Sequence, residues 1–185
     1  QIIIKNIQIY NMKVLITGAT GFVGRHLVKR LKNENVEVTE LNSTNFDSMW
    51  SLEKNSFDCI IHLAVKTAAG GYCQNHPGEQ WIVNSSINVD MLAYWQQYQQ
   101  RATMITFGSS CGYNDKIKKI EPNYLKGEPE TGYEVYGTIK RNLLTGLTAL
   151  KKEFYMDFRY LIPSVFYGPE YDLNDKHFIF DLIKK

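Results

Sequence analysis

Five short runs of apolar and β-branched residues alternate along the chain with longer segments in which apolar side chains recur every three to four positions. The short runs, which predict strands, are Lys13–Thr17, Val36–Leu41, Asp58–Leu63, Thr103–Phe107 and Phe158–Ile162. The longer segments predict helices over about Gly21–Asn33, Ser86–Gln99 and Glu134–Phe154. Strands that alternate with amphipathic helices are typical of a parallel sheet covered on both faces. We therefore predict a doubly wound α/β fold built from five βα units.

The first predicted strand runs directly into a glycine-rich turn, Thr17-Gly18-Ala19-Thr20-Gly21-Phe22-Val23-Gly24, which opens the first helix. In such a turn Gly18 allows a sharp bend, Gly21 lets a phosphate approach the backbone, and Gly24 lets helix and strand pack closely. The helix N-terminus adds N–H groups and a favourable dipole for an anion. The turn therefore predicts a pyrophosphate site. A turn without a ligand is the alternative, because the G-x-x-G-x-x-G spacing differs from the G-x-G-x-x-G of many dinucleotide-binding folds.

Composition narrows the class of protein. The 185 residues are 44% hydrophobic and 22% charged, with a net charge of +2, which suits one domain and gives no reason to expect a nucleic-acid partner. Three cysteines, Cys59, Cys73 and Cys111, lack the C-x-x-C spacing of a zinc site, so we expect no metal and a reducing, cytoplasmic location. No apolar run approaches the roughly 20 residues of a membrane helix, so we expect no membrane partner.

The two ends of the chain predict its domain organisation. Residues 1–11 are rich in isoleucine and precede Met12, from which the sequence leads straight into the first strand. We interpret 1–11 as an N-terminal extension of unclear origin and 12–185 as one nucleotide-binding domain. Because an amphipathic pattern is still running at Leu182 and Ile183 when the sequence stops, we expect a chain truncated before a further domain.

Candidate chemistry lies in Tyr136 and Lys140, which are four residues apart and therefore on one face of the third predicted helix. A tyrosine with a pKa near ~10 is a poor acid–base group at neutral pH, and a nearby ammonium favours its phenolate, so that it can exchange protons with a substrate oxygen. Ser109 follows the fourth strand, at the carboxyl end where ligands of open parallel sheets bind. We expect that strand to end beside the first, and the polar stretch Gly112–Gly132 to form a loop over the site. The alternative is a Tyr and a Lys on a solvated helix.

Four motifs follow one another along the sequence: the TGATGFVG turn, HLA at 62–64, GSSCGY at 108–113 and YGTIK at 136–140. Together they make the sequence from residue 12 onward resemble the extended short-chain dehydrogenase/reductase superfamily, the NAD-dependent epimerases and dehydratases. The resemblance implies a Rossmann-type sheet, a tightly held NAD or NADP, and a nucleotide-sugar substrate bound largely by a C-terminal domain that we expect to be absent here. It also implies Ser109, Tyr136 and Lys140 as the catalytic triad, with Lys140 holding the nicotinamide ribose.

Within that superfamily the sequence is most similar to the GDP-L-fucose synthases. Its Gly108-Ser109-Ser110-Cys111 run matches theirs, whereas 4,6-dehydratases carry an Asp-Glu pair at the last two positions. His177 follows a Tyr-Gly-Pro turn, as in those synthases. The resemblance implies Cys111 and His177 as the acid and base that epimerise two ring carbons beside a 4-ketone before the ketone is reduced, with a GDP-sugar as substrate. Another nucleotide-sugar 4-epimerase or 4-reductase, or a non-catalytic NAD(P)-binding scaffold, is the alternative.

The resemblance also implies which residues surround the cofactor. Besides the turn from Gly18 to Gly24, they are Asn42, Phe46, Asp47, Leu63, Ala64, Lys66, Lys140, Pro163, Ser164 and Val165. Asn42 stands where an acidic residue would bind the ribose 2′-hydroxyl of NAD and arginines would accommodate the 2′-phosphate of NADP. Fucose synthases carry an arginine at the position of Thr20, so the choice between NAD and NADP stays open, with Glu40 favouring NAD.

Two further expectations concern the substrate and a second copy of the chain. Ser109, Ser110, Asn84 and His177 are expected near the substrate, and Asn84 could instead position the backbone. Aromatic side chains on the second predicted helix, Tyr94, Trp95 and Tyr98, could pair with the Tyr136 helix of a second copy, so we expect a homodimer. Packing of these rings into the core is the alternative.

Overall fold

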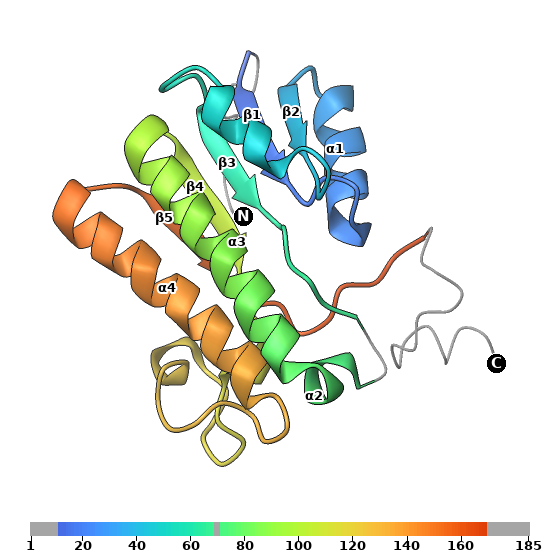
Figure 1. Ribbon diagram of the computed structural model, residues 1–185, viewed down its shortest axis with the longest axis vertical. Coiled ribbons are helices and arrows are strands. Elements are labelled where there is room, and N and C mark those ends of the chain that lie inside the picture. The colour runs from blue at the N-terminus through green and yellow to red at the C-terminus, as the bar shows by residue number, and fades with distance from the viewer. Residues whose placement is uncertain (1–10, 69–70, 170–185) are drawn as a thin grey trace, which may run out of the picture.

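The computed structural model describes residues 11–68 and 71–169. At its centre lies one parallel sheet of five strands in the order β2-β1-β3-β4-β5 (Figure 1). The strands are β1 (Lys13–Thr17), β2 (Glu37–Leu41), β3 (Cys59–His62), β4 (Thr103–Phe107) and β5 (Phe158–Leu161). Their bounds follow the predicted ones closely, because short apolar runs between polar residues mark buried parallel strands.

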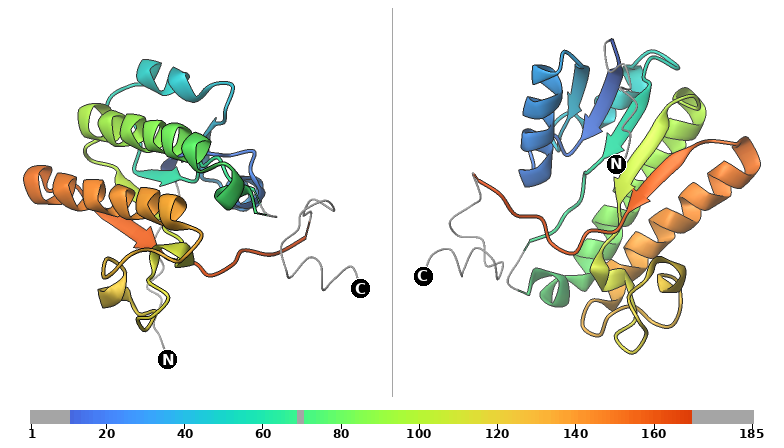
Figure 2. Two further views of the ribbon diagram at one scale, coloured as in Figure 1. Left: turned by 60° about the horizontal axis from the view of Figure 1, so that its bottom comes forward. Right: turned by 180° about the vertical axis from the view of Figure 1, so that it is seen from behind.

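Helices cover both faces of this sheet, which confirms the doubly wound α/β fold predicted from the sequence (Figure 2). α1 (Phe22–Asn33) packs on the face that carries Ile16. α3 (Pro77–Tyr98) and α4 (Glu134–Phe154) pack on the opposite face, which carries Leu15. Neighbouring residues of a strand point to opposite faces, so the central strands bury side chains in both halves of the core.

Two predictions about the helices are corrected by the structure. α3 begins at Pro77, well before the predicted Ser86, because proline fits the first turn of a helix and the polar side chains Gln80 and Asn84 on its buried face conceal the amphipathic pattern. The connection between β2 and β3 contains a 3₁₀-helix, η1 (Phe46–Ser51), in place of an α-helix, so the described residues do not form five complete βα units. The remaining short helices are α2 (Tyr72–Asn75), η2 (Ser110–Gly112) and η3 (Glu121–Asn123).

The place of β4 in the sheet also differs from the prediction. β4 does not end beside β1, because β3 lies between them and pairs with both. The glycine turn after β1 and the Ser109 run after β4 therefore flank the end of β3 at the carboxyl edge of the sheet. This leaves one strand width between the predicted phosphate site and the predicted catalytic site.

The aromatic side chains of α3 belong to the core. Tyr94 and Trp95 are 0% exposed, and the Trp95 indole N–H donates a hydrogen bond to the Ala102 carbonyl oxygen at 2.9 Å. The Gln99 side-chain amide donates to the Tyr94 hydroxyl at 2.9 Å. The prediction that these rings form an exposed face for a second copy is therefore wrong, and the core alternative is correct.

The two long helices are interrupted by polar side chains throughout. α3 has 22 residues and α4 has 21, and both carry charged residues. Among residues 11–68 and 71–169, no helix has the length and apolarity needed to cross a membrane.

Candidate active site

The turn after β1 brings three backbone segments together at the start of α1. Gly18 has a φ of +68°, and a Cβ there would lie 2.8 Å from the backbone nitrogen of Ala64. A Cβ on Gly24 would lie 2.2 Å from the Gly18 carbonyl oxygen. Gly21, the residue before α1, supplies no side-chain cap, which leaves room for a phosphate at the helix N-terminus. These residues fit the pyrophosphate of a dinucleotide.

The other predicted residues of the turn surround this helix start. The Ala19 N–H donates to the Leu41 carbonyl oxygen at 3.1 Å, which ties the turn to the end of β2. Phe22 and Val23 form the first turn of α1, and Thr20 is exposed. Thr20 carries no charge, so it offers no ion pair to a ribose phosphate.

The loop after β2 is ordered by its own asparagines. The Asn42 side-chain oxygen accepts hydrogen bonds from the Thr44 N–H at 2.9 Å and the Thr44 hydroxyl at 2.7 Å. Glu40, expected to favour NAD, is paired with Lys32 at 2.6 Å. Asp47 is exposed, whereas the Phe46 ring is partly buried against the core. Because the Glu40 carboxylate already has a cation beside it, this residue is a weaker argument for NAD than the sequence suggested.

The segment after β3 is held by a buried asparagine on α3. Asn84 is 1% exposed; its side-chain oxygen accepts from the Lys66 N–H at 2.7 Å, and its side-chain nitrogen donates to the Lys66 carbonyl oxygen at 3.0 Å. Both functional groups of Asn84 are thus engaged with backbone. These two bonds fit the expected role of Asn84 in positioning the backbone at Lys66, and its contact with substrate stays a prediction.

His62 fastens the ends of β1 and β3 to α3 beneath this segment. Its Nδ1 lies 2.7 Å from the Thr17 hydroxyl and its Nε2 lies 3.2 Å from the Asn88 side-chain oxygen. The Asn88 oxygen can only accept, so Nε2 carries the proton and Thr17 donates to Nδ1. The Thr17 oxygen also accepts from the Ala64 N–H at 3.2 Å. Burial lowers the pKa of His62 to about 4, so the ring is neutral.

At the end of β4 the predicted catalytic residues lie in a short 3₁₀ turn packed against α4. The Ser109 hydroxyl oxygen accepts a hydrogen bond from the Cys111 N–H at 3.2 Å, and Ser110 begins η2. A Cβ on Gly137 would lie 2.5 Å from the Cys111 carbonyl oxygen, so this glycine lets α4 approach the turn closely. Burial raises the pKa of the Cys111 thiol, which keeps the thiol protonated.

Tyr136 and Lys140 point into the same region from α4, but their electrostatics differ from the prediction. Lys140 is 8% exposed, and its Nζ donates to the Phe107 carbonyl oxygen at 3.0 Å. Burial lowers the pKa of Lys140 to about 8. The Lys140 Nζ lies 5.7 Å from the centre of the Tyr136 ring. Burial raises the pKa of Tyr136, so the phenol stays protonated instead of being driven to the phenolate by Lys140.

Two residues of this site were not predicted. The Thr67 side chain lies close enough to Tyr136 to lower its pKa against the larger effect of burial, and the Thr67 hydroxyl lies 3.8 Å from the Cys73 sulfur. The Cys73 sulfur also accepts from the Gln80 side-chain amide at 3.5 Å. Cys73 lines an open hollow of about 220 Å³ between the start of α3 and the start of α4, together with Gln74, Pro77, Gly132, Tyr133, Glu134 and Val135. A threonine in an irregular segment carries no sequence signal, so only the fold brings Thr67 to Tyr136.

The segment after β5 passes along the carboxyl edge of the sheet toward α1 (Figure 2). It begins with the predicted cofactor residues Pro163, Ser164 and Val165, of which Val165 is 49% exposed. At its far end the Pro169 carbonyl oxygen lies 3.0 Å from the His26 ring nitrogen. His177 lies outside the described residues.

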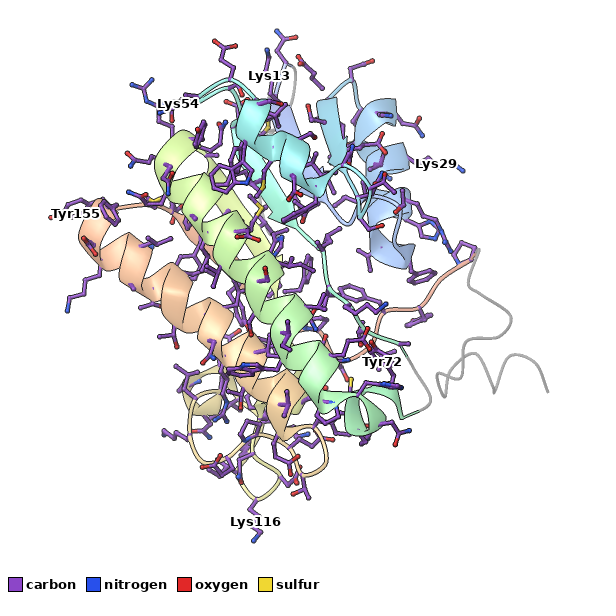
Figure 3. The ribbon with its side chains drawn as sticks, viewed as in Figure 1. Lys13, Lys29, Lys54, Tyr72, Lys116 and Tyr155 are labelled. Atoms are coloured by element: carbon purple, nitrogen blue, oxygen red, sulfur yellow. The ribbon has the colours of Figure 1, made fainter. Side chains whose placement is uncertain are left out.

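The segment from 112 to 132 borders the site and is anchored to α4. The Arg141 guanidinium donates to the Gly112 carbonyl oxygen at 2.7 Å and to the Lys126 carbonyl oxygen at 3.2 Å. Figure 3 shows Lys116 at the outer tip of this segment, pointing away from the sheet. No group of His, Cys, Asp and Glu side chains suited to a metal ion occurs in the part of the chain that the structure describes.

Residues 14–185 match the model of the NAD dependent epimerase/dehydratase family. The chain belongs to this family. Its membership confirms the family resemblance and the NAD or NADP cofactor that the resemblance implied.

Similar proteins cover almost all of this family member, which in turn covers only part of them. GDP-L-colitose synthase of Yersinia pseudotuberculosis is 27% identical over 187 residues, which are 94% of this chain and 60% of that protein. Two solved structures show the same fold: the GDP-mannoheptose C4 reductase MlghC of Campylobacter jejuni with NADP bound (TM-score 0.82, 16% identity, 94% of this chain and 55% of that one) and a GDP-L-fucose synthetase of Naegleria fowleri bound to NADP (TM-score 0.78, 22% identity, 94% and 60%). The chain thus spans little more than half of these relatives.

Proposed function

We propose that this chain is the cofactor-binding and catalytic part of a nucleotide-sugar epimerase/reductase, most like GDP-4-keto-6-deoxymannose 3,5-epimerase-4-reductase (GDP-L-fucose synthase). The observation that carries the proposal is the pair of the half-buried Tyr136 and the buried Lys140 against the end of β4, where Ser109 and Cys111 lie. Family membership and the GDP-sugar enzymes among the similar proteins support it. The proposed substrate is a GDP-sugar, and the proposed cofactor is NADP or NAD.

In the proposed reduction, Tyr136 donates its proton to the oxygen of a 4-keto sugar as the carbonyl becomes an alcohol. The bound cofactor supplies the hydride that the carbonyl carbon receives. Burial keeps the phenol protonated, as an acid must be before transfer. Ser109 donates a hydrogen bond to the same oxygen, and Lys140 holds the nicotinamide ribose while its charge stabilises the tyrosinate left after transfer.

In the proposed epimerisation, a base removes a proton from a ring carbon beside the ketone and an acid returns one to the opposite face. Ser109 and Tyr136 would stabilise the enolate oxygen through hydrogen bonds. The protonated Cys111 thiol suits the acid, and His177 is assigned to the base by its position in the sequence alone. A 4-reductase or 4-epimerase would use Tyr136 and Lys140 without needing Cys111 or His177. This alternative draws on the C4 reductase among the similar structures.

Turnover by the full-length protein that contains this chain tests the proposal. With NADPH or NADH and a GDP-4-keto sugar, Tyr136→Phe should reduce cofactor oxidation by at least about 100-fold, whereas Tyr155→Phe, which is 90% exposed, should leave it unchanged. Cys111→Ser should abolish deuterium uptake from solvent at the ring carbons while reduction of a suitably configured ketone continues. Undiminished uptake in Cys111→Ser would exclude Cys111 as the acid, absence of uptake in the parent would leave a simple reductase or 4-epimerase, and full activity in Tyr136→Phe would favour the scaffold.

A further inference from the structure

Two tyrosines behind the active site connect the Ser109 turn to the helix that carries the acid. The Tyr124 hydroxyl accepts a hydrogen bond from the Ser109 N–H at 3.3 Å. It lies 3.1 Å from the Tyr160 hydroxyl, which donates to the Lys140 carbonyl oxygen at 2.7 Å. Tyr124 directly follows η3 and Tyr160 lies on β5, so two segments outside the predicted motifs meet at this point.

The direction of these hydrogen bonds follows from the number of protons available. The Lys140 carbonyl can only accept, so Tyr160 uses its single proton there. Tyr124 must then donate to the Tyr160 oxygen, and its own oxygen is left to accept from the Ser109 N–H. The result is one directed chain from Ser109 through Tyr124 and Tyr160 to Lys140. Burial raises the pKa of both tyrosines, so both protons stay in place at neutral pH.

The rings are fixed by close packing against glycines on either side of the Ser-Ser-Cys run. A Cβ on Gly108 would lie 2.6 Å from the Tyr160 ring, and one on Gly112 would lie 2.3 Å from the Tyr124 hydroxyl. Tyr124 is 2% exposed, and its ring centre lies 5.0 Å from that of Tyr113 in an edge-to-face contact. These two glycines therefore do more than allow a turn, because they let both phenols reach the backbone of the active site.

This chain of hydrogen bonds forms a second link between the end of β4 and α4. In front, the Lys140 Nζ holds the carbonyl oxygen of Phe107, the last residue of β4. Behind, the two tyrosine hydroxyls hold the Ser109 N–H against the Lys140 backbone. Both links end on Lys140, one helical turn from Tyr136, so the backbone from Phe107 to Ser109 is held to α4 at two points.

We propose that Tyr124 and Tyr160 are positioning residues that set the Ser109 hydroxyl relative to the Tyr136 phenol, so that both reach one substrate oxygen. This inference rests on the proposed function for its catalytic consequence. Its structural part, the transmission from Tyr160 to Ser109, does not depend on any substrate. Loss of either hydroxyl should loosen Ser109 while leaving the dinucleotide site, which is built on β1 and α1, unchanged.

Tyr124→Phe and Tyr160→Phe in the full-length protein test both parts, because each keeps the ring and removes one hydroxyl. In residue-resolved hydrogen–deuterium exchange, the Ser109 amide should exchange about tenfold faster in Tyr160→Phe, although Tyr160 does not touch Ser109. The control is Tyr113→Phe, because the Tyr113 ring packs against Tyr124 but its hydroxyl is not part of the hydrogen-bonded chain. In this variant the Ser109 amide should exchange as in the parent protein. An unchanged Ser109 rate in Tyr160→Phe would overturn the proposal.

Single-turnover cofactor oxidation tests the catalytic consequence. Each Phe variant should be about tenfold slower than the parent, with unchanged affinity for the dinucleotide. In a Ser109→Ala background the same substitutions should cause no further loss, because they act through Ser109. An equal loss in both backgrounds would contradict a positioning role. If the parent turns over no nucleotide-sugar, the proposed function fails, and the exchange measurement still decides whether the tyrosines control Ser109.

Discussion

Lys140 holds an ammonium group in a place that water scarcely reaches. Its Nζ donates to a single backbone oxygen, that of Phe107, while an ammonium has three protons to share. Burial of this charge costs folding free energy, and the cost shows in a pKa lowered to about 8. A residue retained at such a cost suits a role that requires its charge, and holding a ribose beside Tyr136 is such a role.

Lys140→Met should therefore raise the free energy of unfolding and lower the activity. At pH 7 the variant should be more stable to urea than the parent by about 1–3 kcal/mol, because an apolar side chain of similar length replaces a buried charge. The folded-state pKa of Lys140 is lowered, so the parent gains stability as pH rises through and above about 8, and the difference should shrink toward pH 10. Turnover should fall by at least about 100-fold. A variant less stable than the parent at pH 7 would contradict this account.

At this scale the sequence predicted that Tyr136 and Lys140 share one face of a helix but not their ionisation. The four-residue spacing of Tyr136 and Lys140 places them on one face of a helix, as predicted. Spacing says nothing about depth, and depth decides that the phenol is protonated and the amine weakly basic. Thr67, Tyr124 and Tyr160 could not be predicted either, because contacts across the fold bring them to the site.

At the scale of elements, the first βα unit depends on backbone contact between the turn and α1. The closest approach is at Gly24, where a Cβ would lie 2.2 Å from one backbone oxygen and 2.7 Å from another. Backbone atoms cannot turn aside as a flexible side chain can, so α1 would have to move away from β1. That movement would open the helix N-terminus where we place the pyrophosphate.

Gly24→Ala should lower the free energy of unfolding by about 2–4 kcal/mol and weaken dinucleotide binding by at least tenfold. The matched control is Gly78→Ala, also in a helix, because a Cβ at Gly78 would meet nothing within 4 Å. That control should be neutral or more stable by up to about 1 kcal/mol. Thermal unfolding and cofactor fluorescence titration measure both effects. Equal behaviour of the two alanine variants would show that close packing at Gly24 does not matter.

Element bounds were most predictable where apolar residues set them. The strands follow from short apolar runs, and α4 has its predicted bounds because apolar residues recur along one side of it. The start of α3 was missed because its buried face carries Gln80, Asn84 and Asn88, which resemble surface residues in a sequence. Asn84 binds the Lys66 backbone and Asn88 binds His62. The polar residues that make these contacts therefore weaken the amphipathic pattern of the helix.

For the whole molecule, one neutral imidazole joins three elements under the cofactor edge. His62 on β3 contacts Thr17 on β1 and Asn88 on α3, and protonation would force Nδ1 to abandon its role as acceptor. The charged Lys140 nearby also disfavours a second positive charge. Protonation of His62 at low pH should therefore destabilise the contacts between β1, β3 and α3 together.

Stability should decline as pH falls from about 6.5 to about 4, because the folded-state pKa of His62 is lowered and the unfolded chain takes up the proton first. The share due to His62 is on the order of 3 kcal/mol. His62→Gln should remove most of this slope, since glutamine can donate to Asn88 and accept from Thr17 without titrating. His76→Gln, at an exposed histidine, should keep it. Urea denaturation across this pH range measures the slopes, and an undiminished slope in His62→Gln would exclude His62 as its source.

The strand order has a consequence for how the protein is made. After β2, each new strand is added at the same side of the sheet: β3 beside β1, then β4 beside β3 and β5 beside β4. Gly18 gains its backbone contact with Ala64 as soon as β3 is in place, before Tyr136 is synthesised. The growing chain can thus bring its glycine turn against Ala64 first and dock α4 with Tyr136 later, with no strand having to wait for one encoded far downstream.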